Sequence, residues 1–132
     1  MSVYLDKARE LRNRTDVHYN CAQGVLVPFA NDLGLGEDMA VRLGANFGSG
    51  MKMGSTCGAV TGALMVLGLA GITDSLPLIR QVKENHEGMI DCRDLLRENA
   101  KTQTPKKDHC DGMVYELVEM TEKILREKGK IE

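Results

Sequence analysis

The sequence lacks tryptophan and contains only three tyrosines and two phenylalanines. Eight methionines are present instead, and methionine often fills irregular gaps in a core that has few large aromatic rings. A chain of 132 residues with 42% hydrophobic composition can bury one hydrophobic core but not two. We therefore expect a single domain covering residues 1–132.

Several other absences exclude classes of function. Lysine and arginine form no long basic run and the formal charge is −2, so nothing predicts binding to nucleic acid. The longest apolar run, residues 57–72, is shorter than the ~20 residues that cross a bilayer, so no membrane insertion is expected. Residues 1–14 alternate charged and apolar side chains, unlike a signal peptide, which predicts a cytoplasmic protein. Motifs of hydrolases and nucleotide-binding proteins are also missing.

The spacing of apolar residues predicts an all-α fold. Apolar residues recur at steps of three and four, and no segment alternates with the period of two that strands show. We expect a helical bundle of about five to six helices, with a glycine-rich loop at residues 46–50. The predicted helices cover residues 3–13, 21–32, 37–45, 55–69, 76–99 and 108–128.

The chain has four cysteines, Cys21, Cys57, Cys92 and Cys110, and no C-x-x-C pair. Without such a pair, a zinc knuckle and a thioredoxin-like motif are both excluded. In a reducing compartment, four cysteines indicate a redox pair, a metal site or buried thiols more often than two permanent disulfides. Any shared site must be assembled by the fold from distant segments.

Three of the four cysteines follow a residue typical of helix caps. Asn20 precedes Cys21, Ser55 and Thr56 precede Cys57, and Asp108 lies two residues before Cys110. The free N–H groups at a helix start lower the pKa of a thiol, and the thiolate is the form that attacks disulfides and binds metals. If these helix starts meet at one end of a bundle, the three thiols share a site, with Cys92 reaching in from its helix.

Small residues follow Cys57 and also occur in the glycine-rich loop. Each glycine inside a helix costs about 0.5–1 kcal/mol relative to alanine. Two helical glycines within one turn, Gly58 and Gly62, therefore indicate a steric requirement at that face of the helix. Either a neighbouring helix packs closely there, or a group bound to sulfur occupies the space. The candidate cofactor-binding residues are Gly58, Ala59, Gly62, Gly48 and Gly50. In a redox pair, Cys57 is the expected attacking thiolate.

Histidine and basic residues near the cysteines are further candidates. His18 and His109 could lower the pKa of a thiol as imidazolium groups, and His109 could replace one cysteine as a metal ligand. Arg93 and Lys107 could balance the charge of thiolates. The alternative for all four is an ordinary place on the exposed face of a helix.

Several segments resemble the C_GCAxxG_C_C family, whose members are described as redox-active. The resemblance covers Tyr19 to Gln23, Phe47 to Met51, Cys57 to Met65, Asp91 to Leu96, and Cys110. The family is similar to a domain of the split-Soret cytochromes that carries an iron–sulfur centre. The resemblance therefore implies redox or iron–sulfur chemistry at the four cysteines.

These observations lead to one preferred function and two alternatives. The preferred function is electron transfer to a redox partner protein through an iron–sulfur cluster held by Cys21, Cys57, Cys92 and Cys110. The first alternative is a dithiol/disulfide oxidoreductase or redox sensor without a cofactor, and the second is a structural zinc site. A symmetric homodimer that covers exposed apolar stripes is also expected.

Overall fold

The computed structural model describes residues 2–131, and the elements in this range are helices rather than strands. The α-helices are α1 (Val3–Asn13), α2 (Cys21–Ala30), α3 (Glu37–Gly44), α4 (Gly58–Leu69), α5 (Leu76–Asn85), α6 (Cys92–Ala100) and α7 (Lys106–Glu127). A short 3-10 turn, Asn31–Leu33, continues α2, and a tight turn, Gly50–Gly54, precedes α4. The predicted all-α fold is confirmed.

One predicted helix is wrong, because residues 76–99 form two helices. The residues described therefore contain more α-helices than the expected five to six. The break falls at Glu87 and Gly88, which have φ values of +55° and +86°. The N–H of Gly88 donates to the carbonyl of Lys83 at 2.7 Å, which closes the end of α5 with a glycine in the left-handed conformation. Cys92 consequently begins a helix instead of lying inside one.

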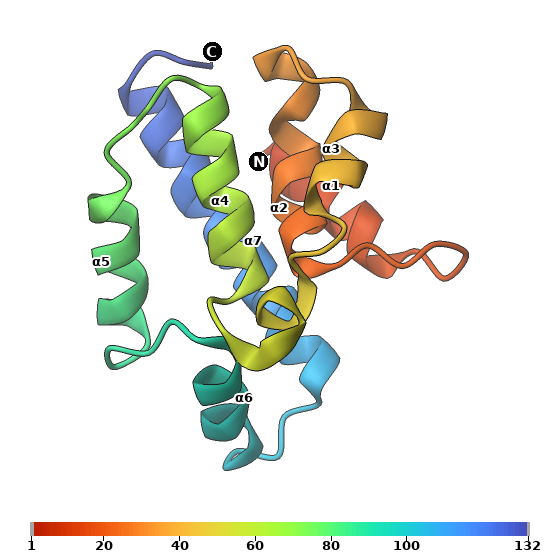
Figure 1. Cartoon of the computed structure of the whole chain (residues 1–132), viewed down its shortest axis with the longest axis vertical. Helices are drawn as coiled ribbons and strands as arrows, with labels where there is room; N and C mark the ends of the chain where they lie inside the picture. The colour runs from red at the N-terminus through yellow and green to blue at the C-terminus, as the bar shows by residue number, and fades with distance from the viewer. Residues whose placement is uncertain (1, 132) are drawn as a thin grey trace.

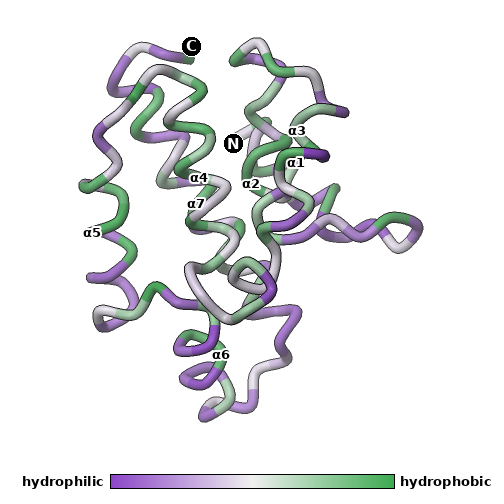
Figure 2. Tube along the Cα trace, in the orientation of Figure 1, coloured by the Kyte–Doolittle hydropathy of each residue, from purple (hydrophilic) through white to green (hydrophobic). Residues whose placement is uncertain are grey.

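Helices α2, α4 and α7 pack against one another at the centre of the molecule and run in the same direction (Figure 1). Segments between them return the chain to its starting end, α3 after α2, and α5 with α6 after α4. The three central helices therefore begin at the same end. Their shared core includes the fully buried Phe29, Leu67 and Leu117. Figure 2 shows that α2 and α4 are the most continuously hydrophobic parts of the chain.

The first turns of α2 and α4 touch backbone to backbone. A Cβ atom on Gly62 would lie 2.6 Å from the carbonyl oxygen of Ala22, and one on Gly58 would lie 2.8 Å from that of Phe47. Real Cβ atoms do not approach oxygen this closely, so both positions require glycine. Close helix packing thus explains the small residues that the sequence places after Cys57.

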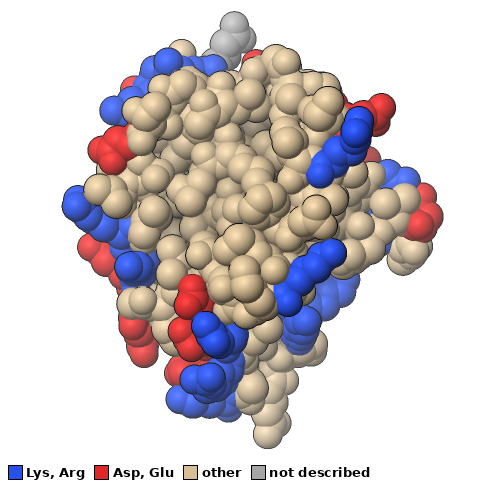
Figure 3. Space-filling model, in the orientation of Figure 1, with Lys and Arg blue, Asp and Glu red and all other residues tan. Residues whose placement is uncertain are grey.

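The structure describes no helix among residues 2–131 that has both the length and the apolar character needed to span a membrane. Helix α4 nevertheless contains no charged residue. Figure 3 shows one face of the molecule with an uncharged centre and charged side chains around its rim. Exposed apolar side chains on α3 and α4 include Met39, Leu43 and Leu69. The symmetric dimer stays a prediction.

We predict that Gly62→Ala lowers the free energy of unfolding by roughly 1–3 kcal/mol, because the added methyl group forces α2 and α4 apart. The matched control is Gly68→Ala in the same helix, where a Cβ would meet no atom within 4 Å. This control should leave stability unchanged or raise it by up to ~1 kcal/mol, since alanine favours a helix. Chemical denaturation followed by circular dichroism compares the two. Equal stability of both variants would contradict the close contact.

Candidate functional site

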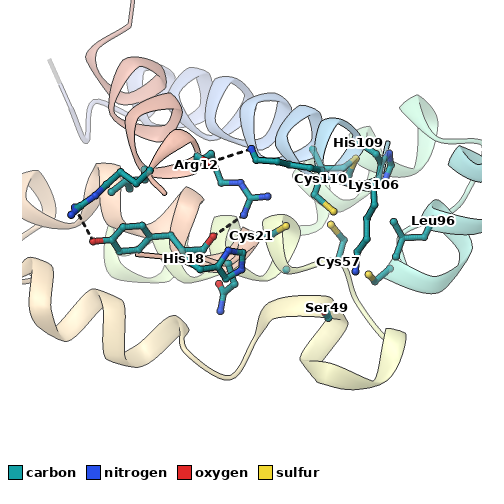
Figure 4. A pocket seen from close by; sticks show the side chains of 17 residues that line it. Arg12, His18, Cys21, Ser49, Cys57, Leu96, Lys106, His109 and Cys110 are labelled. Carbon is teal, nitrogen blue, oxygen red and sulfur yellow. Dashed lines mark hydrogen bonds between the residues drawn. The ribbon is translucent and has the colours of Figure 1, made fainter. Parts of the chain in front are cut away.

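All four cysteines line one cavity of about 350 Å³, at the end of the bundle where the central helices begin. Figure 4 shows the side chains of Cys21, Cys57 and Cys110 pointing toward a common space from three different elements. The sequence-based expectation that the fold gathers the cysteines is met. Three local structures bring the thiols to this position.

Cys21 is the first residue of α2, and a reciprocal cap holds it there. The side chain of Asn20 accepts from the N–H of Gln23 at 2.8 Å, and the side chain of Gln23 accepts from the N–H of Asn20 at 2.8 Å. Both amides also donate to α3, from Asn20 to the carbonyl of Gly44 and from Gln23 to that of Val41. The predicted cap at Asn20 is confirmed, and it anchors Cys21 to two helices.

Cys57 and Cys92 are positioned together by a short backbone bridge. Thr56 and Asp91 form an isolated antiparallel pair, in which the N–H of Cys57 donates to Ile90 at 2.9 Å and that of Cys92 donates to Ser55 at 2.6 Å. Successive residues of extended chain point to opposite sides, so both cysteines lie on the same side of the bridge. Cys57 itself occupies the N-cap position of α4, which the sequence predicts at Ser55 or Thr56.

The glycine-rich segment forms a turn in the left-handed region beside this bridge. Ser49, Gly50, Met51 and Lys52 have φ values between 53° and 61°. A left-handed conformation costs about 1–2 kcal/mol for each residue other than glycine, so the turn is strained. A Cβ on Gly50 would lie 2.8 Å from the Cβ of Cys92. The turn therefore packs directly behind Cys92, and Ser49 lines the cavity.

Cys110 does not begin a helix, contrary to the expectation. Helix α7 starts at Lys106, so Cys110 lies one turn inside it and Asp108 is not its cap. Lys106 is four residues before Cys110 and therefore lies on the same face of α7. Figure 4 shows the side chain of Lys106 extending toward the cysteines. The charge of Lys106 therefore lowers the pKa of Cys110, an effect that the sequence-based prediction attributes to a helix start.

A second cation approaches the cysteines from α1. The Arg12 side chain is only 7% exposed, and its Nε donates to Asp111 Oδ1 at 2.7 Å. One of its terminal nitrogens donates to the carbonyl of Tyr19 at 2.7 Å. In Figure 4 the guanidinium group lies beside Cys21. Sequence reasoning missed Arg12 and Lys106. Lys106 could have been found from its spacing to Cys110 if the start of α7 had been placed correctly.

Cys21 and Cys110 line the same cavity, and their thiols shift each other's pKa values in opposite directions. The hydrogen bond from Cys21 lowers the pKa of Cys110 to about 6, with further lowering from the charges of Arg12 and Lys106 against the effect of burial. The same hydrogen bond, together with burial, raises the pKa of Cys21. At neutral pH the pair therefore consists of a Cys110 thiolate and a Cys21 thiol.

The low pKa that the sequence predicts for Cys57 is wrong. Burial raises its pKa to about 11, although the amide groups of Ala59 and Val60 at the start of α4 act in the opposite direction. Burial also raises the pKa of Cys92, the negative charge of Cys110 adds to this, and Lys106 opposes it. The helix start favours the thiolate of Cys57 as the sequence predicts, but the loss of solvent outweighs it.

The candidate cofactor-binding residues have different positions. Gly58 lines the cavity, whereas Gly48, Gly50, Ala59 and Gly62 are not among its lining residues in the described range 2–131. Gly48 packs against Asn20, since its Cβ would lie 2.7 Å from the Asn20 Cβ. Gly50 and Gly62 likewise allow close approach to the backbone of Ser55 and Ala22, and Ala59 is buried in the core.

Some of the histidine and basic candidates line the cavity and one does not. His18, His109 and Lys107 line the cavity, and the Lys107 ammonium group binds Asp111 at 2.6 Å. Burial lowers the pKa of His109, with a smaller contribution from His86, so its ring is neutral at pH 7 and does not act as an imidazolium. Arg93 packs behind Gly54 instead.

The thiols surround the cavity instead of meeting at one point. Within residues 2–131, no three histidine, cysteine or carboxylate side chains are arranged so that they could hold a metal ion. Ligands of one zinc ion must lie within about 4.6 Å of each other, because each zinc–sulfur bond is ~2.3 Å. The side chains as they stand therefore do not form a closed site for a single ion. Zinc and an iron–sulfur cluster stay predictions.

A family model described as "Putative redox-active protein (C_GCAxxG_C_C)" matches residues 19–124 of the chain. The chain belongs to this family. The resemblance seen in the sequence is confirmed, and the matched range contains all four cysteines of the cavity. No curated protein and no solved structure matches the chain.

We predict that Cys110 reacts with iodoacetamide at pH 7 well ahead of Cys21 and Cys57, because the thiolate is the reactive form. Its rate should rise with pH through about 6 and level off above pH 7, following the pKa of about 6. Peptide mapping by mass spectrometry after short exposures gives the order. Faster modification of Cys57 would contradict the assignment.

Proposed function

We propose that the protein is a dithiol/disulfide redox protein in which Cys110 and Cys21 exchange electrons with a disulfide substrate. The observation that supports this is that the two thiols line the same cavity, from α7 and α2, and shift each other's pKa in opposite directions. A thiolate next to a protonated thiol is the arrangement of an attacking and a resolving cysteine. The description of the family as redox-active agrees with this role.

The reaction follows from the charge states of the pair. The Cys110 thiolate attacks one sulfur of the substrate disulfide, a mixed disulfide forms, and one substrate thiolate leaves and takes up a proton. Cys21 then loses its proton and attacks the Cys110 sulfur, which releases the second substrate thiolate. The products are a Cys21–Cys110 disulfide and two reduced thiols, so two electrons pass from the protein to the substrate.

The surrounding residues favour each step. Arg12 and Lys106 stabilise the negative charge on Cys110 before the attack. Arg12 also favours the thiolate of Cys21, which is needed in the second step. Cys57 and Cys92, whose pKa values are raised, stay protonated and do not compete for the mixed disulfide.

We predict that mild oxidation forms one disulfide, between Cys21 and Cys110. Cys110→Ser should abolish it, because the remaining thiols have raised pKa values, whereas Cys92→Ser should retain it. Alkylation with and without reductant, followed by peptide mapping, identifies the linked residues. Thermal unfolding shows whether both variants are folded. A disulfide between another pair, or none in the folded wild type, would contradict the proposal.

A second candidate is the iron–sulfur centre expected from the sequence. It is favoured by the fact that four thiols, the usual ligands of such clusters, line one cavity of about 350 Å³. Cys21, Cys57, Cys92 and Cys110 would hold the cluster, which supplies one-electron chemistry.

Anaerobic purification distinguishes the two candidates. A cluster protein should be brown, contain iron and acid-labile sulfide, and lose colour in Cys57→Ser as well as in Cys110→Ser. The dithiol proposal predicts a colourless protein in which Cys57→Ser still forms the Cys21–Cys110 disulfide. Metal analysis of the same sample shows whether zinc is present, and stoichiometric zinc bound to the cysteines would contradict both candidates.

A further inference from the structure

The cavity around the thiols is lined by cations but by no acid. Its lining includes Arg12, Arg14, Lys106 and Lys107, and contains no aspartate or glutamate within the described range 2–131. The remaining wall is largely apolar, with Leu11, Leu96 and Met113. A cavity of one charge sign with apolar walls concentrates ligands of the opposite sign.

Two of these positive charges are not balanced by ion pairs. Arg12 and Lys107 share the single carboxylate of Asp111, at 2.7 and 2.6 Å, which leaves one positive charge between them. Lys106 belongs to no ion pair among residues 2–131, which leaves a second. Arg14, by contrast, is paired with Asp16 at 2.6 Å. A single Cys110 thiolate balances only one of these two positive charges, so the cavity keeps a net positive charge.

We propose that the cavity binds a small organic disulfide that carries carboxylate groups, and that Lys106 and the Arg12–Lys107 pair select it by charge. This inference rests on the proposed dithiol function. A volume of about 350 Å³ lies at the lower end of cavities that take small molecules, so the ligand is a compact disulfide instead of a protein segment. The carboxylates meet the cations while the disulfide reaches Cys110.

The reaction is the thiol–disulfide exchange described above, and the carboxylate-bearing disulfide is the oxidant. The Cys110 thiolate breaks the disulfide of the ligand and forms a mixed disulfide, and the first carboxylate-bearing thiolate leaves with a proton from solvent. Cys21 releases its proton and displaces the second carboxylate-bearing thiolate from the Cys110 sulfur. The ligand gains two electrons and the protein keeps a Cys21–Cys110 disulfide.

Three disulfides of different charge test the proposal on the reduced protein at pH 7 and low salt. They are dithiodipropionate, which is a dianion, hydroxyethyl disulfide, which is neutral, and cystamine, which is a dication. Acid quenching and mass spectrometry give the rate at which the Cys21–Cys110 disulfide forms. The readout is the rate with dithiodipropionate divided by the rate with hydroxyethyl disulfide. Dividing this by the same ratio measured with free dithiothreitol corrects for the different intrinsic reactivity of the two disulfides.

We predict that the corrected ratio exceeds one by roughly tenfold or more, and that it falls toward one in about 1 M salt, where charges are screened over ~3 Å. Lys106→Glu should lower the ratio about tenfold. Because this variant also weakens the Cys110 thiolate, both rates will drop, but the ratio isolates the selection by charge. A glutamate in the first turn of α7 suits the helix dipole, so the fold should persist.

The matched control is Lys83→Glu, the same change of charge in α5. Lys83 is exposed and is not among the residues that line the cavity. Its ratio should equal that of the wild type. A wild-type ratio equal to that of dithiothreitol would overturn the charge selection while the proposed function stands. Failure of all three disulfides to form the Cys21–Cys110 bond would overturn the proposed function itself.

Discussion

The contact between the first turns of α2 and α4 is the constraint on which the rest of the site depends. The carbonyl of Ala22 occupies the place that a side chain on Gly62 would need, so the two helices meet at one position. Cys21 directly precedes Ala22, and Cys57 directly precedes Gly58, where a Cβ would lie 3.2 Å from the backbone nitrogen of Ala22. Because a cysteine side chain is short, this backbone contact also sets the distance between the Cys21 and Cys57 thiols.

The rest of the cavity is built outward from this pair of helices. The bridge between Thr56 and Asp91 continues from the start of α4 and brings in Cys92, and α7 packs on both helices and contributes Cys110. The strained turn behind Cys92 is held by the same packing, which is how a structure retains backbone conformations that cost free energy. The assembly uses four separate chain segments to surround one space.

Charge then decides which thiol has the lowest pKa. A buried thiolate is unfavourable without a counter-charge, and Cys57 shows this effect because burial outweighs the amide groups of Ala59 and Val60 that favour its thiolate. Cys110 has the thiol of Cys21 as a donor and two cations nearby. Arg12 is itself held by Asp111, so the ion pair that joins α1 to α7 also supplies charge to the cavity.

The sequence by itself determined the all-α fold, the cap that starts α2, and the positions of Cys21 and Cys57 at helix starts. These depend on local patterns, namely apolar spacing, capping residues and small residues after Cys57. The tertiary structure decided the gathering of the four cysteines around one cavity and the lower pKa of Cys110 relative to Cys57. Arg12 and Asp111 lie 99 residues apart in the chain, and burial depends on all neighbouring elements. A thiol pKa reflects solvent loss and charges brought close by folding, so no local pattern could give it.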